Sequence, residues 1–348
     1  MRMQVTRLLI GVFGAAWLCA APSAQAPVSE LDAHINAAKA AAGLDYRATF
    51  VNLCFAGANP GLANPAVARA GGAAPPGGRA AGGRGAAATP DRATWYASPY
   101  KVFDNFYWLG TRQHSSWALR TSEGLIIIDT NFAWATEPEI INGLTTLGLD
   151  PRQIKYVVIS HAHGDHDQGA AELQKRFGAK VVMGAPDWEA TLKRPATAAG
   201  GVPTRDVVVT PAGMKLTLGD TTIDIVPTPG HTPGTLSYVF PVKDQGRTVM
   251  VAYSGGTLTG AFGADATRWD EYIESQNRIA KAAAAAGATV LLSNHSEYDN
   301  AYTKARLIAA KREVGEEHPF VVGAAAVQRY FTVMTECAQA SRLRAGAK

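Results

Sequence analysis

A strong net charge is missing from this sequence. Its 348 residues include 33 Lys and Arg against 29 Asp and Glu, which gives a formal net charge of +4 at pH 7. The basic residues are scattered and form no stripe of the kind that binds nucleic acid, so we expect no nucleic-acid partner. Charged residues make up 18% of the chain and hydrophobic ones 47%, a balance typical of a folded globular protein and not of a disordered one.

Long apolar runs are also missing beyond the N-terminal region. A helix that spans a bilayer needs about 20 apolar residues, and no later stretch of the sequence has them. The apolar stretch 8–21 follows Arg2 and Arg7 and precedes a small-x-small sequence at residues 24–26. This order is typical of an export signal. We predict that residues 1–26 are a signal peptide, and that the mature protein is periplasmic or secreted and has no membrane anchor. Loss of the two arginines lowers the formal charge from +4 to +2.

Cysteine is scarce, with three residues in the chain. Cys19 lies in the predicted signal, which leaves Cys54 and Cys337 in the mature protein. An exported protein meets an oxidising environment, so these two residues are candidates for a disulfide between an N-terminal segment and a C-terminal helix. The alternative is two unpaired buried thiols, and the sequence does not choose between them.

Composition divides the predicted mature chain into two parts. Residues 27–94 comprise a helical stretch and, over residues 56–94, a segment rich in Gly, Ala and Pro. That segment cannot bury a core and is expected to be a linker or loop, with no role that the sequence reveals. Residues 95–348 alternate strands with helices and end in a helical extension. The folded domain is therefore expected to begin near Trp95.

Strand patterns recur through this domain. Continuous apolar runs at 125–129 and 155–160 predict strands buried on both faces. Helices are expected at 136–147 and 167–177, and a later run of strands precedes the helix 269–286. Two rounds of strands with helices between them predict an α/β fold in which a sandwich of sheets is covered by helices.

Histidine is rare as well, yet three of the eight histidines fall within residues 161–166, His-Ala-His-Gly-Asp-His. His161 and His163 are two residues apart just past a predicted strand, so an extended backbone points both imidazoles the same way. Asp165 and His166 follow at once and face differently. Four adjacent ligands fit two metal ions better than one, and imidazole with carboxylate suits zinc.

Other histidines follow predicted strands in the same way. His231 lies in the Pro/Gly-rich loop 227–234, which would hold a ligand rigidly, and His295 comes just after the strand 289–292. Open sheets commonly place their sites beyond such strand ends. His114 lies in a turn between two strands and either lines the mouth of the site or has a structural role.

These motifs resemble the metallo-β-lactamase superfamily, whose signature is H-x-H-x-D-H. The likeness covers about residues 100–300 and includes the strand 125–129, whose final residue, Asp129, would support the metal loop from behind the ligands, and the loop 230–234. The resemblance implies an αββα sandwich of two mixed β-sheets covered by helices. It also implies two zinc ions per chain.

Subgroups of this family differ after the strand 248–252, where many members place a metal-bridging Asp or a Cys. This chain has Ser-Gly-Gly-Thr at residues 254–257 and neither of those ligands. The implied ligand set is that of subclass B3 metallo-β-lactamases, and the segment 102–110 also resembles the first strand of that subclass. Subclass B3 enzymes usually carry serines after this strand that bind the substrate. In this chain Ser254 or Thr257 is the candidate for that role. The first zinc would be held by His161, His163 and His231, and the second by Asp165, His166 and His295.

The resemblance implies a hydrolase. A zinc-bound hydroxide, available because the metal lowers the pKa of water to about 7, would open a β-lactam ring and confer antibiotic resistance. Asp165 would anchor the second ion and orient the hydroxide, and Asp129 would support the ligands without binding a metal itself. Two zinc ions offset by Asp165 and hydroxide leave a positive site that favours an anionic small-molecule substrate. The alternatives are another hydrolase of this fold, acting on a lactone, ester or amide, and a non-catalytic zinc-binding protein. Oligomeric state is left open.

Overall fold

The computed structural model describes residues 28–55, 89–257, 262–313 and 315–347. The predicted signal peptide and residues 56–88 of the Gly/Ala/Pro-rich segment lie outside the described residues. None of the helices within the described ranges combines the length and the apolar character that crossing a membrane requires.

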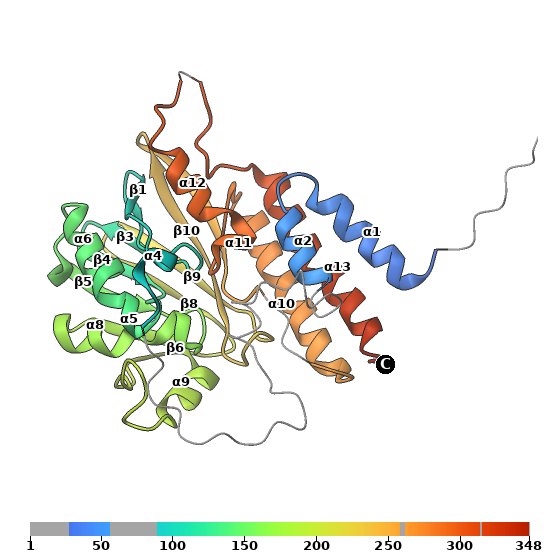
Figure 1. The fold of residues 1–348 in the computed structure, drawn as a ribbon, viewed down its shortest axis with the longest axis horizontal. Helices are drawn as coiled ribbons and strands as arrows, with labels where there is room; N and C mark the ends of the chain where they lie inside the picture. Colours follow the sequence, from blue (N-terminus) through green and yellow to red (C-terminus); the bar gives the residue numbers. More distant parts are fainter. Residues whose placement is uncertain (1–27, 56–88, 258–261, 314, 348) are drawn as a thin grey trace, which may run out of the picture.

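Strands form the centre of the fold (Figure 1). One set comprises β1 Tyr100–Phe103, β2 Phe106–Trp108, β3 Trp117–Thr121, β4 Gly124–Ile128, β5 Ile154–Val158, β6 Lys180–Gly184 and β7 Val207–Val209. The other comprises β8 Met214–Leu218, β9 Thr221–Pro227, β10 Leu236–Asp244, β11 Arg247–Ser254 and β12 Val290–Ser293. In the part of the chain that the structure describes, they form a seven-stranded sheet in the order β1-β2-β3-β4-β5-β6-β7 and a five-stranded sheet in the order β12-β11-β10-β9-β8.

Both sheets are mixed. Strands β4 to β7 run parallel to one another, whereas β1 to β4 pair antiparallel. In the second sheet β11 and β12 are parallel, and the remaining pairs are antiparallel. Strands β9 and β12 run in the same direction, because β9 and β11 are both antiparallel to β10 and β12 is parallel to β11, so the loops that follow them leave the same edge of this sheet. The segment after β5 joins that edge, where Leu236 N donates to the Ser160 carbonyl at 2.8 Å.

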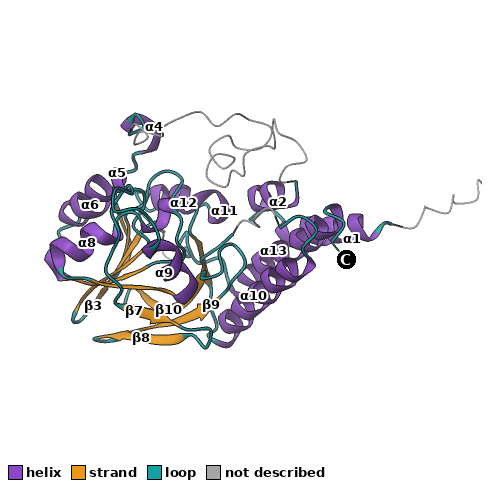
Figure 2. Cartoon of the chain, turned by 90° about the horizontal axis from the view of Figure 1, so that it is seen from below, coloured by secondary structure: helices purple, strands orange, loops and turns teal. Residues whose placement is uncertain are grey.

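Helices cover the outer faces of both sheets (Figure 2). Those over the seven-stranded sheet are α5 Ala133–Ala135, the π-helix η1 Thr136–Ile141, α6 Asn142–Thr146, the 3₁₀ turn η2 Pro151–Gln153, α7 Gly164–Asp167, α8 Ala170–Phe177 and α9 Ala185–Leu192. The remaining helices are α1 Glu30–Ala42, α2 Arg47–Cys54, α4 Arg92–Trp95, α10 Ala266–Ala285, α11 Ser296–Asp299, α12 Ala301–Leu307 and α13 Ala324–Arg344.

Buried side chains fill each interface between these layers. Between the sheets, the rings of Phe106 and Trp117 stack at 4.7 Å, and Phe240 packs on Phe106 from the facing sheet. Another cluster joins the five-stranded sheet to α10 and α13, and a third joins the seven-stranded sheet to α6, α8 and α9. The expected αββα sandwich of two mixed sheets covered by helices is confirmed.

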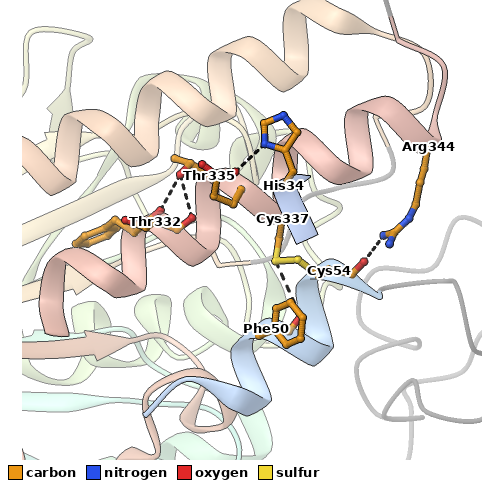
Figure 3. Close-up of a disulfide and its surroundings, with 9 residues drawn as sticks. His34, Phe50, Cys54, Thr332, Thr335, Cys337 and Arg344 are labelled. Carbon is orange, nitrogen blue, oxygen red and sulfur yellow. Dashed lines mark hydrogen bonds and ion pairs between the residues drawn. A yellow bond between two sulfur atoms is a disulfide. The ribbon is translucent and has the colours of Figure 1, made fainter. Parts of the chain in front are cut away.

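The N-terminal helices belong to this domain and pack on its C-terminal helix. A disulfide joins Cys54, at the end of α2, to Cys337 in α13, across a sequence separation of 283 residues (Figure 3). Nearby, His34 Nδ1 lies 2.6 Å from Glu336 Oε2, and Arg344 donates a hydrogen bond to the carbonyl oxygen of Cys54. Of the two alternatives that the sequence left open, the structure therefore has the disulfide.

Several boundaries differ from those expected. Segment 102–110 is not one strand, because the chain turns at Asp104 and Asn105, between β1 and β2. Their side chains accept hydrogen bonds from Gly246 N, in the β10–β11 turn, and from Lys243 N, near the end of β10. The helix expected at 136–147 begins as a π-helix around Pro138, whose ring nitrogen cannot donate a helical hydrogen bond. The helix expected at 167–177 is divided before Gly169, where a Cβ would lie 2.4 Å from Thr136 Oγ1.

The predicted Gly/Ala/Pro-rich segment also ends earlier than residue 94. Within it, Asp91 begins helix α4 by accepting a hydrogen bond from the backbone N–H of Ala93 at 3.1 Å. The indole of Trp95 then packs on Trp134, with 4.6 Å between ring centroids.

Candidate metal centre

Loops that follow β5, β9 and β12 bring the six predicted ligands together at one edge of the sandwich. The first loop leads directly into α7, whose residues include Asp165 and His166. The Pro/Gly-rich loop after β9 carries His231, and His295 caps the N-terminus of α11 just past β12. Each candidate ligand thus lies in a loop that follows a buried strand or in the short helix into which that loop leads.

His161, His163 and His231 form a first ligand group. One ring nitrogen from each lies within 4.8 Å of the others, and His163 Nδ1 is 3.0 Å from His231 Nε2. Burial and the neighbouring imidazoles hold the pKa of His161 well below its usual range, and burial lowers the pKa of His163. Neutral imidazoles such as these can bind a metal ion through a ring nitrogen.

The tautomer of His161 shows which nitrogen is available. Its Nδ1 donates to the carbonyl oxygen of Gly255 at 2.9 Å, so Nε2 carries a lone pair. That Nε2 is buried and has no hydrogen-bond partner among the described residues. An unsatisfied buried acceptor costs about 1–3 kcal/mol, which a metal ion would offset. The group therefore fits a metal with nitrogen ligands, such as zinc.

Asp165, His166 and His295 form a second ligand group. Asp165 Oδ2 lies 3.1 Å from the Nε2 atoms of both His166 and His295, and these two nitrogens are 3.2 Å apart. Burial opposes ionisation of Asp165, but the two imidazoles hold its pKa well below its usual range. Burial likewise lowers the pKa of His166, but Asp165 and Asp129 overcome this effect and raise it to about 10. A divalent cation would take the place of that proton.

Asp129 supports the second group from behind, where the sequence placed it. It is fully buried and has a φ of 57°, a left-handed conformation that a non-glycine residue adopts at some cost. Its Oδ2 accepts hydrogen bonds from His166 Nδ1 at 3.1 Å and from the Tyr253 hydroxyl at 2.8 Å. Its Oδ1 accepts the backbone N–H of Ser160 at 2.7 Å. The bond to Nδ1 directs His166 Nε2 toward Asp165.

Asp187 is a residue of the site that the sequence analysis missed. Its Oδ2 accepts the backbone N–H of Ala162 at 2.7 Å and the Thr232 hydroxyl at 2.7 Å, and its Oδ1 accepts the N–H of Gly234 at 2.9 Å. Burial raises its pKa, although these three donors act against the shift. Because Ala162 separates two ligands and Thr232 follows His231, Asp187 joins both loops of the first group.

His114 also reaches the site and contacts the second group. Its Nε2 lies 3.7 Å from Asp165 Oδ2, and its ring is 5.1 Å from that of His295. Phe132 packs on it edge to face at 5.0 Å. Of the two roles that the sequence left open, the geometry favours the one at the site.

The Ser-Gly-Gly-Thr stretch at residues 254–257, where β11 ends, is buried. Ser254 and Thr257 are each 1% exposed, and the Thr257 hydroxyl lies 2.6 Å from Ser293 Oγ in a buried network. These contacts argue against the expectation that either residue binds substrate. The glycines have a steric reason: a Cβ on Gly255 would lie 1.7 Å from the carbonyl oxygen of Leu236, and one on Gly256 would meet the His231 side chain.

Comparisons with known proteins agree with this geometry. Residues 109–244 match the family model described as the metallo-beta-lactamase superfamily. This match is to part of the chain, and it includes residues 161–166 and His231. The solved structures to which it is similar include BJP-1, a subclass B3 metallo-β-lactamase of Bradyrhizobium japonicum, at 26% identity and a TM-score of 0.58. That alignment covers 72% of this chain and 95% of BJP-1.

Curated relatives at the sequence level have a different activity in their names. The hydroxyacylglutathione hydrolase of Shewanella pealeana is 27% identical over 171 residues, or 48% of this chain. The enzyme of the same name from Acidiphilium cryptum is 33% identical over 88 residues, or 25% of this chain. The chain spans 57% and 31% of the lengths of these two relatives. The comparisons thus support the metallo-β-lactamase fold, and the substrate is a separate question.

Proposed function

We propose that this protein is an exported dinuclear zinc hydrolase that opens β-lactam rings. One observation carries the proposal: Asp165, His166 and His295 meet beside the three-histidine group, with His114 next to them, and residues 247–257 contain no acidic or thiol side chain. This is the arrangement that the resemblance to subclass B3 implies. The likeness to BJP-1 over 95% of that chain supports it.

A zinc pair, when bound, polarises a carbonyl group and makes hydroxide available at neutral pH. The protein supplies the orientation. Asp165 Oδ2 lies 3.1 Å from the Nε2 atoms of both imidazoles of the second group, and its carboxylate would accept a hydrogen bond from a water bound beside them. Asp129 keeps His166 in the tautomer that leaves Nε2 for a metal.

An anionic small molecule suits the charge of this site. Of the six ligands, Asp165 alone carries a formal negative charge, so two divalent cations would leave the site positive. Such a site attracts a substrate that carries a carboxylate, and the common β-lactams carry one.

Hydrolysis of a thioester is the second candidate, and the names of the curated relatives favour it. The resemblance of the active-site loops argues against it, since hydroxyacylglutathione hydrolases place a metal-bridging Asp where this chain has Ser254 and two glycines. The same alternative extends to lactones, simple esters and amides.

Assays on zinc-loaded mature protein separate these candidates. We expect nitrocefin hydrolysis that stops on chelation and returns with zinc, and slower or no hydrolysis of S-lactoylglutathione. His231→Ala should abolish turnover and lower the zinc content, whereas Asp206→Asn, a carboxylate remote from the ligands, should change neither. Thioester turnover without nitrocefin turnover would favour the second candidate. Full zinc content in His231→Ala would contradict the ligand assignment.

Export to an oxidising compartment forms part of the proposal. The disulfide between Cys54 and Cys337 supports it, because such bonds are rare in the cytosol. Expression of the full chain in a Gram-negative host, followed by fractionation and intact-mass measurement, tests it. We expect periplasmic protein that begins at Pro27; cytoplasmic protein with an intact N-terminus would contradict it.

A further inference from the structure

His114 is held against the second ligand group by the backbone. It lies opposite His295 in an isolated antiparallel bridge. The bridge is closed by hydrogen bonds from Ser115 N to the Asn294 carbonyl at 2.9 Å and from Ser296 N to the Gln113 carbonyl at 2.7 Å. Directly opposed residues project their side chains from the same face. The imidazole of His114 therefore projects from the same face as that of His295, toward the candidate metal centre.

Two roles fit this position, and the location of one proton distinguishes them. If Nε2 of His114 carries a lone pair, His114 is a fourth ligand of the second group, with Asp165, His166 and His295. If Nε2 carries the proton, His114 is a hydrogen-bond donor directed at whatever occupies that site. The partner of Nδ1 decides which tautomer is present.

Thr111 is that partner. Its hydroxyl oxygen lies 3.1 Å from His114 Nδ1, and it also accepts the backbone N–H groups of Gln113 at 3.2 Å and of His114 at 2.9 Å. A hydroxyl oxygen has two lone pairs and one proton. Because the two N–H groups occupy the lone pairs, the hydroxyl proton points to Nδ1. Nδ1 is then an acceptor, and the proton of the neutral ring lies on Nε2.

One ligand atom each of His114, Asp165 and His295 lie within 4.8 Å of one another, so distance alone would allow His114 to bind a metal. The position of its proton argues against this, because Nε2–H makes no hydrogen bond to Asp165. Asp165 Oδ2 is 3.7 Å from Nε2, which is longer than a hydrogen bond. Phe132 packs against the ring at 5.0 Å and limits its rotation. The donor is thus fixed beside the second ligand group and available to a bound molecule.

We propose that His114 contacts the substrate and is not a metal ligand: its Nε2–H donates a hydrogen bond to an anionic oxygen bound at the second ligand group. The inference rests on the proposed metal-dependent function. It predicts that the substrate, or the group that leaves it, carries a negatively charged oxygen, in a carboxylate or an oxyanion. This oxygen would lie beside Asp165 and His295, within reach of His114.

Cobalt-substituted protein tests this, with inorganic phosphate as the oxyanion probe. We expect His114→Ala to retain the wild-type cobalt content and the wild-type visible spectrum in the absence of phosphate. Its Kd for phosphate should rise about 10- to 100-fold, the range for a lost hydrogen bond to a charged group. His114→Gln keeps a side-chain N–H and should recover part of the affinity.

Variants of Thr111 provide a matched pair. Thr111→Ser keeps the hydroxyl and should behave as wild type. Thr111→Val removes the donor to Nδ1, frees His114 to bind metal through Nε2, and should change the cobalt spectrum while weakening phosphate binding.

Specific results would overturn the inference. Loss of cobalt from His114→Ala, or a changed spectrum before phosphate is added, would make His114 a ligand. Unchanged phosphate affinity with full cobalt content would exclude the contact. A wild-type protein that holds cobalt and binds phosphate but turns over no β-lactam would refute the proposed function alone, and one that binds no cobalt would refute both.

Discussion

Replacing Asp187 by asparagine removes the charge that joins the two loops of the first ligand group. The carboxylate accepts hydrogen bonds from Ala162 N, the Thr232 hydroxyl and Gly234 N, all at 2.7–2.9 Å. An amide has one acceptor oxygen. If that oxygen stays toward Ala162 and Thr232, the amide NH₂ faces the N–H of Gly234, and two buried donors oppose each other.

The magnitude follows from these contacts. One buried donor left unsatisfied costs about 1–3 kcal/mol, and the other two bonds lose their charge assistance. Burial raises the pKa of Asp187, which means that its charge is costly to bury. Removing that charge therefore offsets part of the loss. We expect unfolding free energy to fall by about 1–3 kcal/mol and zinc affinity to fall about 10- to 100-fold, as for other residues that position metal ligands.

Chelator-competition titration of zinc and urea denaturation of the metal-free protein measure the two effects separately. Asp206→Asn is the matched control, since Asp206 accepts from Val181 N at 2.9 Å and Gln174 Nε2 at 2.6 Å, away from the ligand loops. The control should lose stability but not zinc affinity. If Asp187→Asn lost stability and kept wild-type zinc affinity, the positioning role would be refuted.

Further predictions concern other parts of the fold. Gly256→Ala would place a Cβ 2.6 Å from the His231 Cβ, so we expect zinc content to fall with little loss of helicity. Full zinc content would show that the loop moves enough to accept the methyl group. Cys54→Ser with Cys337→Ser should lower unfolding free energy by about 3–5 kcal/mol, because the bond closes a loop spanning 283 residues, and urea midpoints with unchanged zinc affinity check this. Burial raises the pKa of Glu139 to about 8, against hydrogen bonding by Ala97 N. Folding therefore takes up a proton between the unfolded value of 4.5 and about pH 8, and stability falls as pH rises through that window. Glu139→Gln should abolish this dependence and gain about 2–4 kcal/mol near pH 8; equal slopes of stability against pH would contradict the assignment.

The sequence by itself determined the type of fold and the ligands that lie close together in the chain. Buried strands at 125–129 and 155–160 appear as continuous apolar runs because both of their faces are covered. Residues 161–166 carry their spacing in the sequence, so alternation of side chains is enough to predict that His161 and His163 face one way. These features depend on neighbours along the chain, and no tertiary information is needed to read them.

Only the tertiary structure decided the contacts between distant segments. Asp187 lies on a helix with no motif around it, and its role exists because α9 packs where the loops after β5 and β9 meet. The pairing of Cys54 with Cys337, and the position of His114 opposite His295, likewise depend on which strands and helices become neighbours. Sheet order and packing set those distances, and residues separated by 25 positions, as Ala162 and Asp187 are, or by 283, as the cysteines are, carry no local pattern that records them.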